Sequence, residues 1–311
     1  MQKVILFVVV EPSSYSHCST ALNPAITVVS PWLKFSYRIV CYFLSLKSAF
    51  IEVLASTQSL QRNIHSGKSC LLQVTNAYFQ CMENESKRER VVEARMKLKA
   101  RFEEKMKQTP SMADDKPLGS GAPNRHGMPV LPVGQIVTTK WPVLDLGEQP
   151  EIPLQDWRLI IDGAIENPLV LTWEDFMTLP QTDDASDFHC VTTWSKLNLH
   201  WKGVRLMDLA ALVQPKEQAT HIMCYGYDDY STNLLLEEAL KPDVLLVHTV
   251  EGKPLPKEHG GPVRMITPQL YAWKGAKWIN RIEFMTANRL GFWEKRGYSN
   301  TAYPWRNDRY S

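Results

Sequence analysis

Cysteine, histidine and hydroxyl side chains are concentrated in one short stretch, residues 188–195. Residues 186–191 are predicted to form a β-strand, which carries Cys190 near its end and gives way to two threonines and a tryptophan. A thiolate at a strand end, beside a polar loop, is able to ligate a metal or to act as a nucleophile. A lone cysteine is more often a small buried hydrophobe, so this stretch alone does not decide its role.

A second chemical segment is His-Gly-Gly-Pro-Val-Arg at residues 259–264. Its paired glycines allow backbone N–H groups to approach a ligand closely. His259 supplies a hydrogen-bond donor and Arg264 a fixed, positively charged fork, which together suit a phosphate or a polar ring system. The plainer interpretation is a glycine-rich hairpin with exposed charges.

Three further segments carry polar groups that a packed core would not favour. Trp-Lys-Gly-Ala-Lys-Trp at residues 273–278 suits an anionic or aromatic ligand, or else forms a surface turn with its tryptophans packed inward. Residues 225–233 are rich in tyrosine and aspartate and include Tyr230; a solvated loop is the alternative. Residues 138–142 form an extended arm that is otherwise a plain linker.

Other chemistries have little support. His189 is the base nearest to Cys190 in sequence, which allows a thiol enzyme, but adjacent residues of a strand point to opposite faces. Cys224 is predicted to lie in the core. No dinucleotide, P-loop, serine-hydrolase or zinc-protease motif occurs, and no cysteine spacing typical of zinc sites. The two separated cysteines after residue 81 indicate a reducing compartment, and because no convincing export signal is evident we expect a cytoplasmic location.

The elements that must position these groups are mostly short strands. The chain has 311 residues, 44% of them hydrophobic, and a net charge of +2, which indicates a globular protein without strong affinity for nucleic acid or membrane. Two or three short helices and no βαβ alternation predict an α+β fold, a mixed and β-rich single domain. The predicted strands are 157–161, 169–171, 186–191, 221–225, 244–249, 263–267 and 278–285.

Composition divides the chain into three parts. Residues 1–81 form a poorly ordered extension that need not belong to the native protein, because Met82 and Met96 are both plausible starts. Residues 82–120 combine a charged, solvated helix over 83–107 with a linker rich in proline and glycine. Residues 121–311 carry the strands and every chemical segment.

Four motifs together resemble one family. The sequences DFHCVTTWS, HGGPVRMITP, YAWKGAKWINRIEFM and RLGFWEKRGY, in this order, are similar to the molybdenum-cofactor domain of the sulfite oxidase family. The match is closest to its small bacterial sulfite oxidase-like branch and spans residues 124–311. The resemblance implies the sulfite oxidase type of fold and oxygen-atom transfer at a molybdopterin cofactor. A non-catalytic binding module on the same scaffold is the competing interpretation.

The resemblance also assigns roles to individual residues. Cys190 is implied as the protein ligand of molybdenum, and Tyr230 as a catalytic residue of the substrate pocket. The segments described above are implied to hold the cofactor through His259, Arg264, Gly275, Ala276, Lys277, Thr139, Lys140 and Trp141.

One position departs from the family pattern. Sulfite-oxidising members carry an arginine five positions after the cysteine, where this chain has Ser195, preceded by Trp194. This pair looks more like the branch that reduces methionine sulfoxide, so we expect an enzyme that is not a true sulfite oxidase, with an S- or N-oxide reductase as the alternative. The expected partners are a small-molecule substrate and a separate electron-transfer protein, without membrane insertion, on a monomer or weak homo-oligomer.

Overall fold

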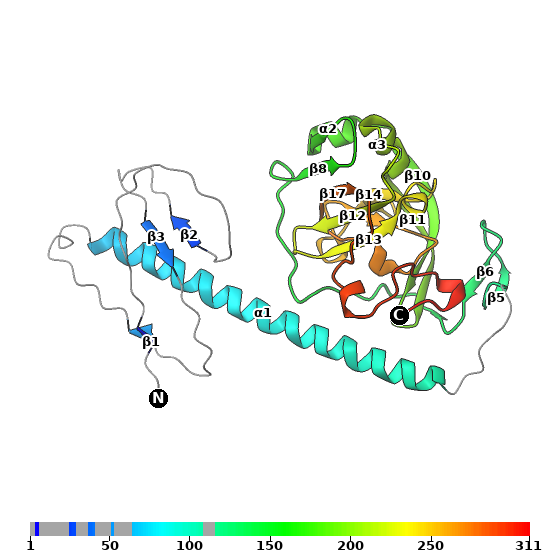
Figure 1. The fold of residues 1–311 in the computed structure, drawn as a ribbon, viewed down its shortest axis with the longest axis horizontal. Coiled ribbons are helices and arrows are strands. Elements are labelled where there is room, and N and C mark those ends of the chain that lie inside the picture. The colour runs from blue at the N-terminus through cyan, green and yellow to red at the C-terminus, as the bar shows by residue number, and fades with distance from the viewer. Residues whose placement is uncertain (1–3, 6–24, 29–36, 41–50, 53–63, 108–115) are drawn as a thin grey trace. The chain divides into compact units, whose positions relative to one another are not determined.

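The computed structural model describes residues 4–5, 25–28, 37–40, 51–52, 64–107 and 116–311 (Figure 1). The chain divides into two compact units, residues 1–76 and 77–311. The first unit contains two small strand pairs: β1 (Val4–Ile5) with β4 (Ile51–Glu52), and β2 (Ala25–Val28) with β3 (Tyr37–Val40). The prediction that the working protein starts at Met82 or Met96 concerns residues that lie largely outside the described ones, and it stays a prediction.

The charged helix is confirmed and is longer than expected. α1 (Ile64–Lys107) begins well before the predicted start at residue 83 and passes from the first unit into the second. Its sequence is rich in good helix formers, and Glu–Lys pairs four residues apart stabilise its exposed face. Among the described helices, α1 included, none is long and apolar enough to cross a membrane.

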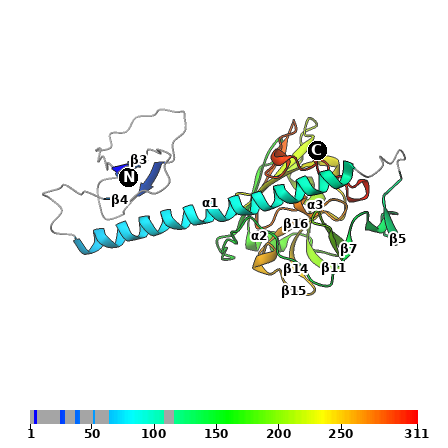
Figure 2. The same ribbon diagram turned by 90° about the horizontal axis from the view of Figure 1, so that it is seen from below.

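One face of α1 packs on the second unit (Figure 2). Val92 contacts the hydrophobic core, and the Arg88 guanidinium donates a hydrogen bond to the carbonyl of Asp228 at 3.1 Å. Phe102 meets Tyr310 edge to face, with ring centroids 5.4 Å apart. Val92 lies four residues after Arg88 and Phe102 ten residues after Val92, so the three side chains lie on one side of the helix. The helix is therefore part of the folded domain rather than a purely solvated arm.

Two sheets form the second unit. One has the strand order β10–β11–β14–β15, with β16 added beside β14 and β7 beside β11; the other has the order β13–β12–β17–β8–β9. Most neighbouring strands are antiparallel. Their bounds are β7 (Ile136–Val137), β8 (Arg158–Gly163), β9 (Leu169–Thr172), β10 (Thr182–Cys190), β11 (Trp194–Arg205), β12 (His221–Gly226), β13 (Ser231–Leu235), β14 (Leu245–Val250), β15 (Lys253–Pro254), β16 (Arg264–Ile266) and β17 (Ile279–Met285).

Helices and short turns complete the unit. α2 (Trp173–Thr178) and α3 (Leu206–Val213) lie at one end of it (Figure 1). The remaining elements are α4 (Leu236–Ala239), the hairpin β5 (Gly119–Pro123) and β6 (Pro129–Pro132), and the 3₁₀ turns η1 (Lys257–His259), η2 (Ala272–Lys274), η3 (Glu294–Arg296) and η4 (Pro304–Arg306). This mixture of many strands and few short helices confirms the predicted α+β, β-rich fold.

A single large core holds both sheets together. The side chains of Trp157, Ile222, Leu246 and Ile282 are fully buried in it, and they come from both sheets and the loop before β8. Burial of such side chains contributes about 1.5–3 kcal/mol each, which fixes the relative position of the sheets. The chemical segments lie in the loops and strand ends at the margin of this core, where polar groups reach a cavity.

Candidate active site

A tight turn between β10 and β11 fixes Cys190. The backbone N–H of Thr193 donates to the carbonyl of Cys190 at 3.1 Å, and Thr193 adopts a left-handed conformation with φ of 76°. This turn sets Cys190 opposite Trp194 in the antiparallel register. Residues directly opposite each other share a face of the sheet, so the thiol and the indole point the same way. The Cys190 Sγ also lies 3.1 Å from the Thr192 hydroxyl.

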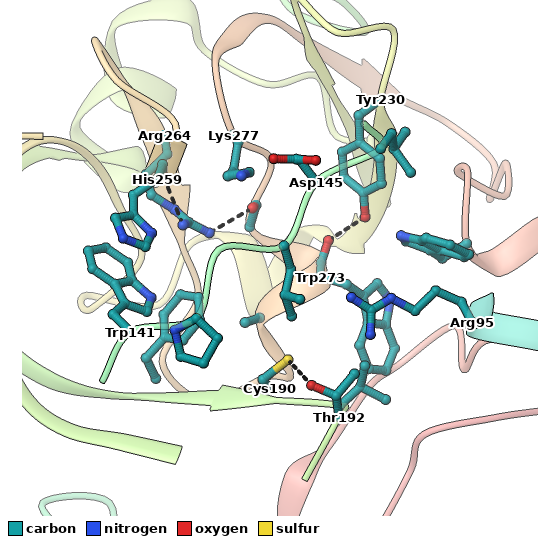
Figure 3. A pocket seen from close by; sticks show the side chains of 18 of the residues that line it. Arg95, Trp141, Asp145, Cys190, Thr192, Tyr230, His259, Arg264, Trp273 and Lys277 are labelled. Carbon is teal, nitrogen blue, oxygen red and sulfur yellow. Dashed lines mark hydrogen bonds between the residues drawn. The ribbon is translucent and has the colours of Figure 1, made fainter. Parts of the chain in front are cut away.

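That face lines a pocket with an empty volume of about 820 Å³, part of it open to solvent (Figure 3). Seven of the residues that the sequence singled out line it together, although they come from distant parts of the chain: Trp141, Cys190, Tyr230, His259, Arg264, Gly275 and Lys277.

Three other predicted cofactor residues do not line this pocket. Thr139 and Lys140 are exposed, and the Thr139 carbonyl accepts a hydrogen bond from Lys196 instead. Ala276 is completely buried behind the pocket wall. From the extended arm Trp141 and Pro142 reach the pocket, and the Trp141 ring stacks on the imidazole of His259 with centroids 3.6 Å apart and planes 4° apart.

A cluster of basic side chains closes one end of the pocket (Figure 3). The buried Arg264 guanidinium donates to the carbonyls of His259 at 3.0 Å, Gly275 at 3.2 Å and Met265 at 3.3 Å. The Lys277 ammonium donates to the carbonyl of Glu258 at 2.7 Å. All these acceptors are neutral, and within the described part of the chain neither Arg264 nor Lys277 forms an ion pair.

Burial without an ion-pair partner lowers the pKa values of the basic side chains in this cluster. Burial lowers the pKa of Arg264 to about 10. Burial, followed by the charge of Arg264, lowers the pKa of Lys277 to about 8 and that of His259 to about 4. An anion at this end of the pocket would offset the cost of holding two cations out of water. The donor set therefore fits the phosphate of a pterin cofactor.

Lys277 should make cofactor binding and cofactor-free stability respond to pH in opposite ways. Its pKa of about 8 lies below the ordinary value of 10.5, so the charged form is disfavoured by folding. The unfolded chain therefore binds more protons between about pH 8 and 10.5, and stability rises with pH in that window. Phosphate requires the charged lysine, so retention of the cofactor should weaken above pH 8.

Thermal unfolding of cofactor-free protein and cofactor retention on gel filtration, both between pH 7 and pH 10, measure these two trends. In Lys277→Met, the unfolding temperature and the cofactor retention should both depend less on pH than in the wild type. Equal pH profiles for the wild type and this variant would show that Lys277 is not the responsible group.

Glycines allow the cluster to form. Gly260 has a φ of 108°, and a Cβ there would come within 3.0 Å of the Cβ atoms of Arg264 and Lys277. A Cβ on Gly275 would lie 2.4 Å from the carbonyl oxygen of Met265. These close approaches bring the two cations to the same end of the pocket, which explains why both segments contain glycine.

The two lysines of residues 273–278 have different environments. Lys274 is completely buried and donates to Glu294 Oε1 at 2.7 Å and to the carbonyl and side-chain oxygens of Asn233. Its charge is therefore compensated by a buried ion pair, whereas Lys277 forms no ion pair with the described residues. The sequence segment combines one lysine that stabilises the fold with one that faces the pocket.

Replacement of Glu294 by glutamine is expected to destabilise the fold strongly. The Lys274–Glu294 pair is fully buried, and removal of one partner leaves an uncompensated charge, at a cost of about 3–5 kcal/mol. Denaturant unfolding measures this loss. The matched control is Glu103→Gln, which breaks the partly exposed pair with Lys99 and should cost less than about 1 kcal/mol. Similar losses in the two variants would contradict the assignment.

Tyr230 and Asp228 lie together in the pocket wall. The Tyr230 hydroxyl donates to the carbonyl of Trp273 at 2.6 Å, and burial raises its pKa well above the ordinary value, so the phenol stays protonated. Its proton must turn away from Trp273 to reach a ligand. Asp228, which the sequence analysis did not single out, has a pKa raised by burial to about 6.

His189 and Ser195 lie on the other side of the hairpin. They are paired in the register, the imidazole Nδ1 is 2.8 Å from the Ser195 hydroxyl, and this hydroxyl is 3.3 Å from the side-chain oxygen of Gln135. Ser195 is fully buried and does not line the pocket, which receives Trp194 instead. The imidazole is thus engaged with Ser195 and not with the Cys190 thiol, which gives the thiol-enzyme alternative no support.

Sequence reasoning missed one cation of the pocket. Arg95 on α1 lines the pocket near Thr192, on the side away from Arg264 and Lys277 (Figure 3). Its charge, together with that of Arg309, opposes the rise that burial causes in the pKa of Cys190. The signal in the sequence was the spacing of residues 88, 92, 95, 99 and 102, which places Arg95 on the packed face of the helix.

Comparison with known proteins agrees with this geometry. The family model described as the oxidoreductase molybdopterin binding domain matches residues 146–293. The uncharacterized oxidoreductase YuiH of Bacillus subtilis is 39% identical over 182 residues, which cover 58% of this chain and 92% of that protein. The protein-methionine-sulfoxide reductase catalytic subunit MsrP of Campylobacter jejuni is 30% identical over 157 residues, covering 45% of this chain and 52% of that subunit.

The sulfane dehydrogenase SoxCD of Paracoccus pantotrophus aligns in structure with a TM-score of 0.44 and 24% identity, over 49% of this chain and 43% of that one. The match to YuiH extends over nearly the whole of that relative, and the family model covers the segments that contain Cys190, Tyr230 and the basic cluster. The chain therefore belongs to the sulfite oxidase family of molybdopterin-dependent oxidoreductases.

Proposed function

We propose that the pocket holds molybdopterin with its metal at Cys190, and that the enzyme removes an oxygen atom from an S-oxide. When bound, the cofactor supplies two-electron oxygen-atom transfer chemistry. One observation carries the proposal: a single pocket has a thiol at one side and, at the other, buried cations that donate only to neutral carbonyls. This combination suits a ligand that offers a metal at one end and a phosphate at the other.

The cation end binds and orients the cofactor. The Arg264 guanidinium and the Lys277 ammonium now donate to neutral carbonyls and are able to donate to phosphate oxygens instead. Hydrogen bonds between charged groups are stronger than those to neutral carbonyls. The stacked pair of Trp141 and His259 forms a flat aromatic wall beside them, which suits the planar pterin ring. These roles depend on the charge and shape of the side chains. They are tested by measuring how tightly the protein binds the pterin part of the cofactor without molybdenum.

The thiol end holds the metal. The hairpin turn fixes Cys190, and metal binding deprotonates a coordinating thiol. The charges of Arg95, Arg264 and Arg309 all favour the thiolate. The carboxylates that line the pocket are Asp145 and Asp228, so cations outnumber anions around the ligand.

Reduction of an S-oxide to a sulfide consumes two electrons and two protons and releases one water. Asp228 is able to hold a proton near neutral pH because burial raises its pKa to about 6, and it lies next to Tyr230 in the pocket wall. The electrons come from a separate electron-transfer partner, as expected from the sequence.

Two observations support the direction of transfer. Relatives at 30% and 31% identity are named protein-methionine-sulfoxide reductases. The pocket wall near Cys190 is aromatic, with Trp194, Trp273, Trp293 and Tyr298, and sulfur makes favourable contacts with aromatic rings.

Turnover with a chemically reduced dye tests this proposal. The cofactor-loaded enzyme should oxidise the dye only when an S-oxide is present, with two electrons used per S-oxide. Sulfite with an oxidised dye is the comparison. Faster sulfite oxidation than S-oxide reduction would overturn the direction, and purified protein without molybdenum or pterin would favour the non-catalytic binding module.

A further inference from the structure

Arg95 is a cation of the pocket that the cofactor does not require. It extends from α1 on the side of Thr192, whereas Arg264 and Lys277 occupy the other end (Figure 3). Its side chain is half-buried, and within the described residues it forms no hydrogen bond or ion pair. A half-buried guanidinium without a partner keeps its donors available, so its position in the pocket suits an anion from outside the chain.

The half-buried cations of α1 on either side of Arg95 have partners, whereas Arg90 and Arg101, for which the described residues provide no hydrogen bond or ion pair, are exposed to water. Arg88 donates to the carbonyl of Asp228, Lys97 pairs with Glu93 at 2.7 Å on the exposed face, and Lys99 pairs with Glu103 at 2.5 Å. The combination of partial burial and no partner thus distinguishes Arg95 from the other described basic residues of this stretch, and Arg95 is the one that lines the pocket.

α1 holds Arg95 in place. One turn before it, Val92 packs on the core, and two turns after it Phe102 meets Tyr310. Lys99, one turn after Arg95, lies over the Tyr310 ring with its ammonium 5.6 Å from the centroid. With anchors on both sides, the helix presents Arg95 to the pocket at a fixed site, which reduces the ordering cost of gripping a ligand.

Arg95 also shares a cavity with the metal-ligand position. Arg95, Cys190 and Tyr298 line the same pocket. Trp293, Tyr298 and Trp273 line the space between α1 and Cys190 with aromatic surface. A molecule that places an apolar body on these rings brings a charged end to the guanidinium.

We propose that Arg95 is a substrate-binding residue and that the substrate carries an anionic group, such as a carboxylate or a sulfonate, beside the atom that reacts. The proposal rests on the proposed S-oxide reduction and adds a substrate class to it. α1, which lies outside the stretch matched by the family model, thereby determines specificity.

Anion binding tests this without turnover. Methanesulfonate is titrated into the cofactor-loaded full chain at constant ionic strength, and quenching of tryptophan emission reports binding. Arg95→Gln should raise the dissociation constant about 10–100-fold, the factor for losing a charge-assisted hydrogen bond. Arg95→Lys should have a smaller effect. Lys97→Gln, the same charge change on the exposed face, should have none.

A specificity measurement completes the test. Arg95→Gln should raise the KM for methionine sulfoxide, which has a carboxylate, by a larger factor than the KM for neutral dimethyl sulfoxide, and should change kcat for the two substrates by the same factor. The inference is overturned if wild-type protein does not bind methanesulfonate, or if Arg95→Gln binds it equally well, or if Lys97→Gln loses as much. Anion binding that depends on Arg95 without turnover of either S-oxide would leave this inference standing and overturn the proposed reaction.

Discussion

Cys190→Ser is expected to abolish turnover while the domain stays folded. A serine hydroxyl is a poor substitute for a thiolate as a ligand of a soft metal centre. The loss should exceed the 10–100-fold or so that removal of an outer-shell partner of a metal ligand typically costs. Because serine is close in size and keeps a hydrogen bond to the Thr192 hydroxyl, the free energy of unfolding should fall by only about 1 kcal/mol.

Cys224→Ser is the matched control. Cys224 is also fully buried, but it does not line the pocket, and its thiol lies 3.8 Å from the sulfur of Met265. Steady-state kinetics and denaturant unfolding of both variants separate chemistry from packing. Full activity in Cys190→Ser, or an equal loss in Cys224→Ser, would refute the assigned role of Cys190.

Arg264→Met should release the cofactor. Methionine fills a similar volume without the charge, so the phosphate end of the pocket loses its buried fork. A hydrogen bond to a charged group contributes about 1.5–3 kcal/mol, and cofactor retention should fall about 10–100-fold. Molybdenum and pterin content after gel filtration measures the change.

The stability of cofactor-free Arg264→Met should change little, by less than about 2 kcal/mol. Removal of an unpaired buried charge is favourable, while the carbonyls of His259 and Gly275 lose their donor, so the two effects oppose each other. Arg281→Met is the control, because Arg281 is paired with Asp162 outside the pocket. Equal cofactor content in wild type and Arg264→Met would contradict the role of Arg264.

Apolar runs allowed most of the fold to be predicted. Residues 221–225 and 244–249 are continuous β-branched or apolar segments, and they form β12 and β14 in the interior of the two sheets. β11 was missed, although it is the longest strand of the second unit. Its buried Leu199 and Trp201 alternate with polar residues, but Asn198 adopts a left-handed φ of 54° that interrupts the pattern.

The pocket could be predicted only in part. Cys190, Arg264 and Lys277 stood out because their residue types sit beside glycines, turns and strand ends, which are recognisable in sequence. The face of β11 on which the Ser195 side chain lies depends on the length of the turn before that strand. A turn that is one residue longer or shorter would move every side chain of the strand to the opposite face. Arg95 was missed because α1 packs partly through the aliphatic stems of charged side chains, which a count of apolar positions does not reveal.

The central claim is that Cys190 is the protein ligand of the molybdenum in a molybdopterin enzyme. X-ray absorption at the molybdenum edge of the cofactor-loaded wild type and of Cys190→Ser tests it most directly. We predict one sulfur neighbour fewer around the metal in the variant, with the dithiolene sulfurs of the pterin unchanged. Identical sulfur neighbours in the two proteins would contradict the claim.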